Sequence, residues 1–541
     1  MKSRLKNAPN IVLISADQLR SDFVGCYGNN WINTPNIDSI ASEGCLFRNA
    51  FSPNPVCIPA RHNLLTGLPA RFHGFDDNYF GAEARPCPYY LPVFPQILSD
   101  CGYATAAIGK MHFQPERRST GFDVFLNSDE VVYDISEDDY AKDLVKEGFG
   151  NVGSIHGVRN ILYMQPQRSL LPEKLHGSMW VGDKSVEYIR SRTTRKDRPF
   201  LLWAGFIHPH PPFDIPDGWA HLYDGKVPKP TKPLTPLCQI AEENKRIAFL
   251  PDDETVNRMR ELYACAVSLV DYNVGRILKA LDENGFRENT LVVFLSDHGE
   301  MLGDLGTYQK FLPYDASMKI PMVIRWPERI APGTVFEDFC DLNDVLPTFL
   351  DAAGADYPAD YRLPGASLLT ENTAKDRSYQ YGEFQHGNKR WCCIRTHRYL
   401  LVHHYGGPEE LYNLKSDPEQ RRNLLYGATN AKTMNIRDSL AAVLAEHESV
   451  WGLEGYVKDG SFVDFPEYSA QPFREGCFPM DMKRNPSDPP LDNLLDEALK
   501  AIEKEPLVKV SNLEVDSILL PNGFSQRQID DFKKKAALQG N

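Results

Sequence analysis

The sequence predicts an α/β protein with a large mixed, mostly parallel sheet sandwiched by helices and a smaller C-terminal subdomain of antiparallel sheet and helix. Over the first two-thirds of the chain, short apolar runs alternate with longer helical patterns, which is typical of a sheet with helical connections. The runs are apolar on both faces, as strands buried between two helix layers are. From about residue 390 the pattern changes to short alternating segments, which indicates antiparallel strands.

The length of the chain predicts more than one domain. At 541 residues it is too long for a single simple core. We predict a large α/β domain that carries the chemistry over residues 1–385, a small sheet-and-helix subdomain over 386–452, and an extension over 453–541. The extension packs either on its own core or on the partner subunit of a homo-oligomer, and the sequence leaves the oligomeric state open.

Five apolar runs predict buried strands in the large domain. They lie at residues 10–15, 105–110, 200–206, 291–296 and 322–325. The runs end directly in polar residues that are capable of chemistry. Since ligand sites in open α/β sheets collect at the carboxyl ends of the strands, the functional site is expected there.

Helical patterns lie between and after these runs. In the large domain they cover residues 36–43, 59–67, 92–101, 253–284 and 341–353. The longest has apolar residues near helical spacing from Met259 to Leu278. In the C-terminal part, strands at 391–395, 399–403 and 410–414 precede a helix at about 432–448, and a further helix is expected at 491–504.

Composition and charge exclude several classes of protein. Hydrophobic content of 42% and aromatic content of 11% fit a well-packed globular protein. A net charge of −14, without a Lys/Arg-rich stripe, argues against a nucleic-acid binder. Part of the negative charge lies between Asp129 and Glu147, which we interpret as a solvated surface.

The sequence also predicts that the protein has no membrane partner. No stretch approaches the length of a transmembrane helix. The N-terminal segment is polar and basic, and the apolar run at residues 11–14 is too short for the core of a signal peptide. The eleven cysteines are scattered and include no CxxC pair, as expected of buried thiols in a cytosolic protein. We therefore expect a cytoplasmic location.

Chemically capable side chains gather at four predicted strand ends. They are Asp17 and Gln18, Lys110 and His112, His208 and His210, and Asp297 and His298, to which Lys310 and the segment Cys57–Arg61 are added. Converging at one sheet edge, they would form a cation-bearing pocket for an anion with tetrahedral oxygens. Cys57 heads a helical pattern with Pro59 in the first turn, so it is expected at a helix N-terminus, which favours a nearby anion. Taken alone, Cys57 would be interpreted as a buried thiol.

An ordered series of motifs makes the interpretation more specific. The segments, in chain order, are Thr-Pro-Asn-Ile-Asp at 34–38, Asn-Pro-Val-Cys-Ile-Pro-Ala-Arg at 54–61, Leu-Leu-Thr-Gly at 64–67, Gly-Lys-Met-His at 109–112, Pro-His-Pro-Pro-Phe at 209–213, Ser-Asp-His-Gly-Glu at 296–300 and Glu-Leu-Tyr-Asn-Leu at 410–414. Over roughly residues 9–450 the chain resembles the type I sulfatases of the alkaline-phosphatase-like superfamily. It is also similar to their relatives, the phosphonate monoester hydrolases.

The resemblance implies a sulfuric ester hydrolase with a modified nucleophile. In this family the cysteine that matches Cys57 is oxidised to formylglycine (3-oxoalanine) by a maturation enzyme. One hydroxyl of the hydrated aldehyde attacks sulfur, and the other later expels the ester as the aldehyde re-forms.

The resemblance also assigns roles to the other residues. A divalent metal would be held by Asp17, Gln18, Asp297, His298 and the modified Cys57. Arg61 would fix the modified residue, and His112 would take up the proton of its second hydroxyl. Lys110, His210 and Lys310 would neutralise the oxygens of the substrate, with His210 or Lys310 protonating the leaving oxygen.

Two departures from the commonest sulfatase pattern concern the metal and the substrate. Gln18 stands where many members have a second Asp, and His298 stands where many have Asn. An imidazole ligand suits Mn²⁺ or another transition metal better than Ca²⁺, but calcium is preferred overall, with manganese the alternative. The same pairs occur in phosphonate monoester hydrolases and in carbohydrate and choline sulfatases.

The expected substrate is a small-molecule or oligosaccharide sulfate ester, first of all a sulfated carbohydrate. The alternative is a phosphonate monoester or a phosphodiester. A non-catalytic anion-binding protein of this fold is disfavoured, because none of the polar strand ends is missing. For substrate contacts we predict His73, Asp77 and Asn78, which follow the nucleophile helix, and His208.

Overall fold

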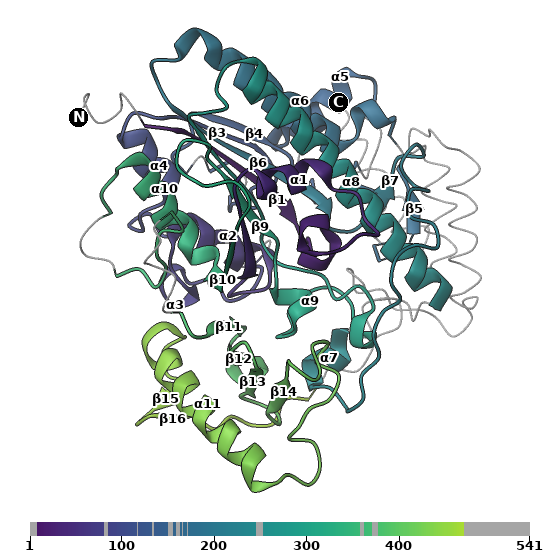
Figure 1. Cartoon of the computed structure of the whole chain (residues 1–541), viewed down its shortest axis with the longest axis vertical. Helices are drawn as coiled ribbons and strands as arrows, with labels where there is room; N and C mark the ends of the chain where they lie inside the picture. Colours follow the sequence, from purple (N-terminus) through teal and green to yellow (C-terminus); the bar gives the residue numbers. More distant parts are fainter. Residues whose placement is uncertain are drawn as a thin grey trace, which may run out of the picture.

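The computed structural model describes residues 8–79, 85–115, 117–118, 120–132, 135–149, 155–157, 163–164, 166–169, 171–244, 253–357, 362–369 and 377–469. Figure 1 shows a large α/β part and, below it, a small sheet with one long helix. The predicted helix at 491–504, and the extension from residue 470 onward, lie outside the described residues.

The large sheet confirms the predicted fold class. Its eight strands, in order across the sheet, are β10 (Thr334–Asp341), β2 (Cys45–Phe51), β9 (Met322–Arg325), β8 (Thr290–Ser296), β1 (Asn10–Asp17), β6 (Phe200–Pro209), β3 (Ala104–Gly109) and β4 (Val124–Asn127). Among these strands β9 runs antiparallel to both of its neighbours, and the other neighbouring pairs are parallel.

All five predicted strands are present, whereas β2, β4 and β10 are strands that the sequence did not predict. The apolar pattern of β2 is interrupted by Arg48 and Asn49, which are only half-buried. The first half of β10 is largely exposed, so it lacks the continuous apolar run of a central strand.

Helices cover both faces of the sheet. Successive side chains of a strand point to opposite sides, so a continuous apolar strand presents an apolar surface to each helix layer. On β1, Val12 and Ile14 pack with the layer of α1 (Pro35–Ser42), α5 (Asp139–Lys146), α6 (Gly177–Ser191) and α8 (Asp253–Glu283). Ile11 and Leu13 pack with the other layer, which is formed by α2 (Cys57–Thr66), α4 (Phe94–Asp100) and α10 (Val345–Ala353). Each fully buried aliphatic side chain stabilises this arrangement by about 1.5–3 kcal/mol.

The predicted helices coincide closely with α1, α2, α4, α8 and α10. In α8 the apolar residues from Met259 to Leu278 are buried, as their spacing predicts. The helix α6 was not predicted, because Gly177 and Gly182 weaken its helical pattern. Gly182 is explained by packing, since a Cβ at this position would collide with the side-chain oxygen of Asn273 on α8.

Short elements complete the large domain. They are α3 (Ala70–His73), α7 (Gln239–Asn244), α9 (Asp315–Met318), β5 (Pro166–Arg168) and β7 (Phe213–Ile215). Strands β5 and β7 pair in parallel beside the main sheet.

The C-terminal part contains the predicted antiparallel sheet. Its strands are β11 (Gln380–Phe384), β12 (Trp391–Arg395), β13 (Tyr399–His404) and β14 (Glu410–Asn413). The sheet begins at Gln380, before the predicted boundary at residue 386, because β11 pairs with β12 along its whole length. A short hairpin of β15 (Val457–Lys458) and β16 (Ser461–Phe462) follows.

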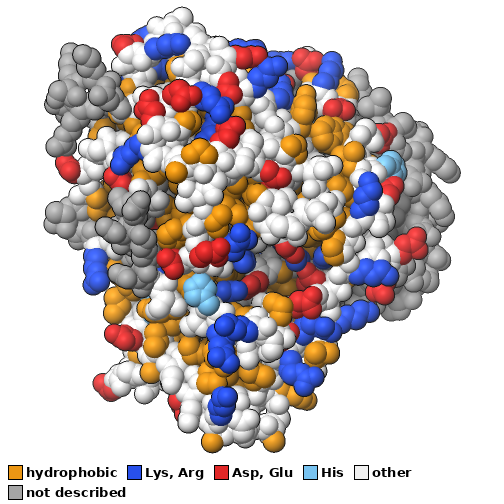
Figure 2. Space-filling model, in the orientation of Figure 1, with side chains coloured by type: hydrophobic (Ala, Val, Ile, Leu, Met, Phe, Trp, Pro, Cys, Tyr) orange, Lys and Arg blue, Asp and Glu red, His pale blue; other side chains and the backbone are white. Residues whose placement is uncertain are grey.

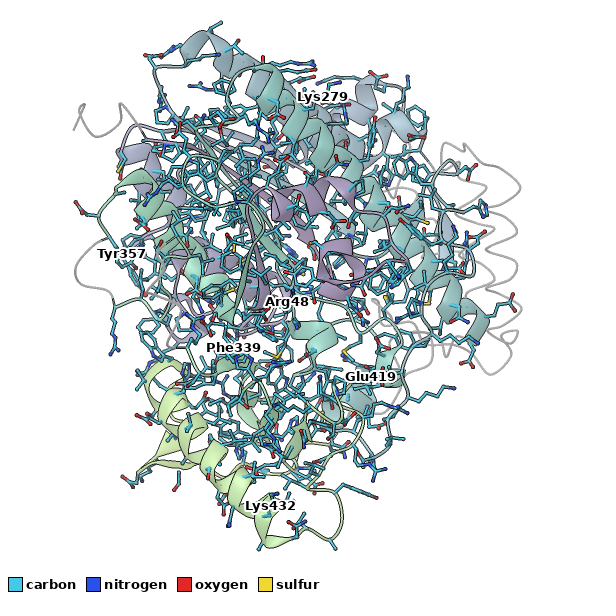
Figure 3. All side chains as sticks on the ribbon, in the orientation of Figure 1. Arg48, Lys279, Phe339, Tyr357, Glu419 and Lys432 are labelled. Carbon is cyan, nitrogen blue, oxygen red and sulfur yellow. The ribbon has the colours of Figure 1, made fainter. Side chains whose placement is uncertain are left out.

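One face of this small sheet packs on α11 (Ala431–Trp451), and the other packs on the large domain. Phe339 of β10 (Figure 3) belongs to the same buried apolar cluster as Trp391 and Val402 of the small sheet. The two sheets are therefore joined by buried apolar contacts.

On the face of the molecule in Figure 2, acidic and basic side chains are interspersed, and hydrophobic side chains show between them. Within the described residues, no helix combines the length and apolar character that crossing a bilayer requires.

Candidate active site

The pairing of β1 with β8 brings two carboxylates together. Ala16 at the end of β1 is opposite Ser296 at the end of β8, so the next residues, Asp17 and Asp297, lie side by side. Both are buried. This edge is formed by carboxyl ends of parallel strands, where the sequence predicted the site.

The other neighbour of β1 adds basic groups to the same edge. Asp17 is paired with Pro209 at the end of β6, which places His210 next to it, and Lys110 follows β3 on the far side of β6. The turn into Lys110 requires glycine at position 109, because its φ is +97° and a Cβ there would collide with the carbonyl oxygen of Gly205. Lys110 is completely buried.

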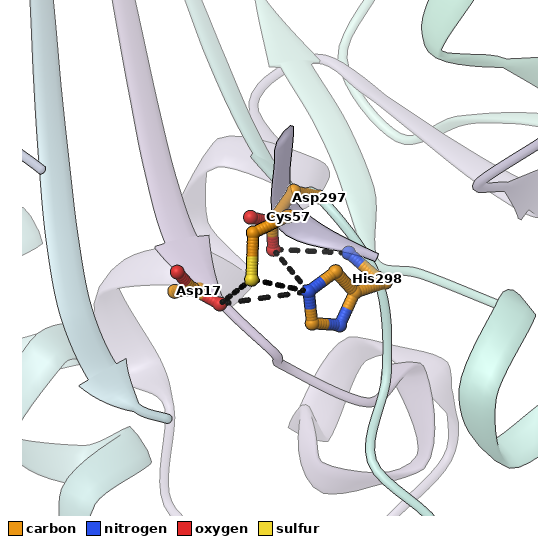
Figure 4. A group of neighbouring side chains, drawn as sticks. All are labelled: Asp17, Cys57, Asp297 and His298. Carbon is orange, nitrogen blue, oxygen red and sulfur yellow. Dashed lines mark hydrogen bonds and ion pairs between the residues drawn. The ribbon is translucent and has the colours of Figure 1, made fainter. Parts of the chain in front are cut away.

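Cys57 lies at the centre of this group (Figure 4). It is the first residue of α2 and has 0% exposure. Its Sγ is 3.2 Å from His298 Nε2, 3.9 Å from Asp17 Oδ1 and 3.3 Å from Lys310 Nζ. The ligand atoms of Asp17, Cys57, Asp297 and His298 all lie within 4.8 Å of one another, so these four side chains could hold one metal ion.

Arg61 links the nucleophile helix to both carboxylates. It lies one turn after Cys57 on α2, and therefore on the same face of the helix. Its Nε donates to Asp297 Oδ2 at 2.9 Å and its Nη2 to Asp17 Oδ2 at 3.2 Å. Its Nη1 donates to the carbonyl oxygen of Lys110 at 2.7 Å, which fixes the backbone of that residue.

The neighbouring cations keep the carboxylates charged. Burial, together with the charge of Asp297, would raise the pKa of Asp17, but the neighbouring cations Lys110 and Arg61 help to lower it to about 2. Burial also opposes ionisation of Asp297, and His298, Arg61 and Lys110 nevertheless hold its pKa well below the usual range. Two ionised carboxylates beside an imidazole form a suitable set of ligands for a divalent cation.

A second set of polar groups surrounds Lys310, which is 3.3 Å from Cys57 Sγ. Lys310 Nζ is 3.0 Å from His210 Nε2 and donates to Gln18 Oε1 at 2.6 Å. Burial lowers the pKa of His210 well below its usual value, and Lys310 and Lys110 lower it further against the effect of Glu130. Burial opposes the charge of Lys310 too, but Cys57, Tyr163 and Asp17 raise its pKa. Lys310 is therefore the cation of this pair.

Gln18 and His112 both have backbone conformations that are uncommon for residues other than glycine, with φ of 64° and 60°. In this conformation the Gln18 backbone N–H donates to Asp297 Oδ1 at 3.0 Å. Its side-chain oxygen accepts from Lys310, while its amide nitrogen contacts Glu300. His112 is buried at 4% exposure.

The residues predicted to contact the substrate have contacts within the fold. His73 is buried, and its ring nitrogens bond Asn63 Oδ1 at 2.7 Å and the N–H of Phe75 at 3.1 Å. His208 is also buried and bonds Asp214 Oδ1 at 3.0 Å and Ser178 Oγ at 3.2 Å.

Asp77 and Asn78 lie nearer to the nucleophile. Asn78 Oδ1 accepts from the N–H of Ile58 at 2.8 Å, in the first turn of α2. Asp77 contacts the amide nitrogen of Gln385, which follows β11 of the small sheet. A direct role of any of these four residues toward substrate stays a prediction.

Two acidic residues of the site were missed by the sequence analysis. Glu130 forms an ion pair with Lys110, and one of its carboxylate oxygens lies 3.1 Å from Nε2 of His210. Glu300 is completely buried, contacts the Gln18 amide and accepts from the N–H of Leu302 at 2.8 Å. Glu300 could have been recognised from the Ser-Asp-His-Gly-Glu motif, since a carboxylate beside a strand end is a candidate ligand or orienting group.

Glu130 was missed because its segment is rich in charge, and the solvated surface predicted for Asp129–Glu147 is wrong in part. Asp129, Glu130 and Asp138 are buried, with at most 9% exposure. Within the stretch, Asp138 accepts from the backbone N–H of Asp129 and of Ala141, both at 2.7 Å. The partner of Glu130, Lys110, comes from another segment. Only the tertiary structure shows that this acidic stretch turns inward toward Lys110.

We expect Glu130→Gln to lower kcat/KM by about 10- to 100-fold, an effect typical of losing a group that positions catalytic residues. The amide keeps the shape but removes the charge that pairs with Lys110. Steady-state kinetics of this variant and of Glu137→Gln, which is half-exposed on the same segment, check the expectation. Equal rates for Glu130→Gln and the wild type would contradict it.

Comparison with known families agrees with this geometry. The family described as "Sulfatase" matches residues 9–355, which span the large sheet and the whole cluster around Cys57. The family described as "N-sulphoglucosamine sulphohydrolase, C-terminal" matches residues 303–449, which include the small sheet.

Individual relatives cover most of the chain. An arylsulfatase of Clostridium perfringens is 31% identical over 77% of this chain and 90% of its own length. An N-acetylglucosamine-6-O-sulfatase of Bacteroides thetaiotaomicron is 29% identical over 78% of this chain and 84% of its own length. The fold matches the crystal structure of a phosphonate monoester hydrolase of Agrobacterium radiobacter with a TM-score of 0.70, at 23% identity over 84% of this chain and 99% of that one. By family match and by relatedness, this chain belongs to the sulfatase family and is a sulfuric ester hydrolase.

Proposed function

We propose that this sulfatase cleaves a sulfated carbohydrate with a formylglycine nucleophile made from Cys57 by a maturation enzyme. One observation carries the proposal: Cys57 begins a helix and lies within 4 Å of Asp17, His298 and Lys310, at the edge where four strand ends meet. The sugar substrate is supported by the similarity to the N-acetylglucosamine-6-O-sulfatase. A buried thiol kept only for packing would not need three polar neighbours.

The donor set fits a divalent cation. Asp17, Asp297 and His298 would hold it, together with the modified Cys57, and Gln18 would complete the set if its amide oxygen, which now accepts a hydrogen bond from Lys310, bound the metal instead. When bound, the ion would supply positive charge that orients the sulfate oxygens and favours ionisation of the nucleophile. Two carboxylates suit calcium, our first choice, and the imidazole makes manganese the alternative.

The chain's own cations bind and orient the anion. Cys57 Sγ marks the position of the reacting oxygen, and Lys310 Nζ is already 3.3 Å from it. Lys110 is held beside the carboxylate of Asp17 at 2.5 Å and by Glu130. Because these groups are buried and fixed by hydrogen bonds, they stabilise the charge that builds on the sulfate oxygens without reorganising.

For the proton that the leaving oxygen takes up, Lys310 is favoured over His210. The surroundings raise the pKa of Lys310, whereas burial and two neighbouring lysines keep His210 neutral. His210 accepts a hydrogen bond from Lys310 at Nε2 and so orients the ammonium group. His112, which is buried and follows Lys110 by two residues, is proposed to take up the second proton of the nucleophile.

A phosphonate or phosphodiester hydrolase is the second candidate. Gln18 and His298, which replace the acid and amide of the commonest sulfatase pattern, are compatible with it, as they are with carbohydrate and choline sulfatases. The same cations would bind a phosphonate, since both substrates present tetrahedral anionic oxygens. Rates on matched aryl sulfate and aryl phosphonate esters separate the two, and a much higher kcat/KM for the phosphonate would refute the sulfate proposal.

Mass spectrometry of the tryptic peptide that contains Cys57 tests the nucleophile. After co-expression with a maturation enzyme, conversion of the thiol to the aldehyde lowers the peptide mass by about 18 Da, as expected for a covalent change from CH₂–SH to CHO. The converted fraction should rise in proportion to specific activity. A fully active preparation that contains only the unmodified thiol would refute the mechanism.

Asp77→Asn should separate stability from substrate binding. Burial raises the pKa of Asp77 to about 6, so its contribution to folding is favourable below the unfolded value near 3.8 and is lost as the pH rises through about 6. At pH 7 the variant should therefore be more stable, by about 1 kcal/mol after allowing for partial exposure, and equally stable at pH 3. Denaturant titrations at both pH values measure this.

If Asp77 contacts a sugar hydroxyl, the same variant should raise KM for a sulfated sugar by about 10-fold with little change in kcat, as loss of one hydrogen bond to substrate does. An aryl sulfate without hydroxyls serves as the control substrate. An unchanged KM for the sugar would remove Asp77 from the binding site.

A further inference from the structure

Three side chains outside the catalytic cluster bring a sulfur, a nitrogen and an oxygen donor together at the seam between the small sheet and the large domain. Cys238 directly precedes α7, His404 ends β13, and Glu410 begins β14. All three are buried, with exposures of 4%, 6% and 2%. Their ligand atoms lie within 4.8 Å of one another, which is close enough for one ion to contact them all.

The topology of the small sheet explains this convergence. Val402 of β13 is opposite Glu410 of β14, so His404, two residues further along β13, lies on the same face as Glu410. This face packs against the large domain, in the apolar cluster that contains Cys238 and Val402. The three donors are thus carried by elements whose positions the core fixes.

His404 and Glu410 are close neighbours without a well-aligned hydrogen bond between them. His404 Nε2 is 3.4 Å from Glu410 Oε2, yet this buried nitrogen has no hydrogen bond of acceptable geometry within the described part of the chain. The hydroxyl of Tyr314 is 3.2 Å from both carboxylate oxygens of Glu410 and holds the group in place. Its neighbours in the cluster are Cys238 and Glu410, and a metal ion bound to all three would give this buried nitrogen a strong, well-aligned partner.

Beside the cluster there is room for a fourth ligand of the size of a water molecule. Cys238 and His404 border a cavity of about 10 Å³, which is about the space that one water molecule needs. In a tetrahedral zinc site, bonds of about 2.0–2.3 Å place the ligand atoms about 3.3–3.8 Å apart. The distance between His404 and Glu410 already lies in this range.

We propose that Cys238, His404 and Glu410 bind a Zn²⁺ ion, with water as the fourth ligand. A thiolate and an imidazole select zinc over calcium or magnesium, because those harder cations prefer oxygen ligands. The site is separate from the cluster around Cys57 and does not depend on the proposed reaction. Its role is structural: it ties the start of α7 to the small sheet.

The proposed zinc site is connected to the active site through α7. Asn244, the last residue of α7, donates from Nδ2 to the carbonyl oxygen of Lys310 at 2.7 Å. Fixing α7 at Cys238 therefore helps to fix the backbone of Lys310. Loss of the ion should lower the thermal stability of the protein first.

The test uses full-length protein in a Cys57→Ser background, which removes the thiol of the catalytic cluster. Metal-free protein is titrated with Co²⁺, and the thiolate-to-cobalt charge-transfer absorption in the near ultraviolet is recorded. We expect one equivalent of this absorption per chain, its loss on adding Zn²⁺, and an increase of several degrees in Tm with zinc. Cys393→Ser, which removes a buried thiol of the same sheet outside the cluster, should leave all three unchanged.

Cys238→Ser should abolish the cobalt absorption, and His404→Gln and Glu410→Gln should weaken zinc binding by at least 10-fold. The last two keep the thiol and so test the site even if Cys238→Ser folds poorly. No charge-transfer absorption in the Cys57→Ser protein, or an unchanged one after Cys238→Ser, would overturn the proposal and leave a hydrogen-bonded thiol in its place.

Discussion

Cys57→Ala is expected to reduce kcat by at least about 10⁴-fold, since removal of a covalent nucleophile leaves only the binding and electrostatic contributions of the site. The alanine side chain cannot be oxidised to an aldehyde, and so no nucleophile forms. Folding should be nearly unaffected. The thiol is the smallest member of the cluster, and Arg61 would still pair with Asp17 and Asp297.

The matched control is Cys265→Ala, which removes an equally buried thiol from the middle of α8. This variant should keep wild-type kcat and lose only the stability that the buried sulfur contributes. Both proteins are measured with the same aryl sulfate, and their Tm values are compared. Near-normal kcat for Cys57→Ala would exclude Cys57 as the source of the nucleophile.

Asp297→Asn is expected to lower both metal affinity and kcat/KM by about 10³-fold or more, because it removes a ligand charge and reverses a hydrogen bond. Oδ1 of Asp297 accepts from the backbone N–H groups of Gln18 and His298, both at 3.0 Å. In the variant, the asparagine oxygen would take the place of Oδ1, and the amide nitrogen would take the place of Oδ2. The nitrogen would then face Arg61 Nε, which in the wild type donates to Oδ2 at 2.9 Å. Two donors would then oppose each other.

The loss of this buried ion pair should also cost about 3–5 kcal/mol of stability, the range for removing one partner of such a pair. Asp304→Asn is the control, since Asp304 is a buried acid paired with Arg20 at 2.6 Å outside the cluster. It should lose comparable stability but retain metal binding per folded molecule. Metal content after dialysis and unfolding curves distinguish the two, and wild-type metal affinity in Asp297→Asn would remove Asp297 from the metal site.

The sequence predicted the parts of the site that follow a strong local pattern. Asp17, Lys110, His210 and Asp297 each come directly after a continuous apolar run, so their places at strand ends could be inferred without coordinates. The strands β2 and β10 lack such a run because their side chains are partly exposed, and they were missed. A sequence therefore predicts fully buried strands better than partly exposed ones, because it is the apolar run that can be recognised.

The chain by itself determined the fold class, the nucleophile helix and most of the cluster, because these depend on short-range hydrophobic spacing and on ordered motifs. The tertiary structure decided which strand ends are neighbours, and so which charges meet. The order β8-β1-β6-β3 places Asp297, Asp17, His210 and Lys110 in one row. The tertiary structure also turns Glu130 inward and places Cys238 against the small sheet. Such contacts join residues far apart in the chain, and no local pattern encodes them.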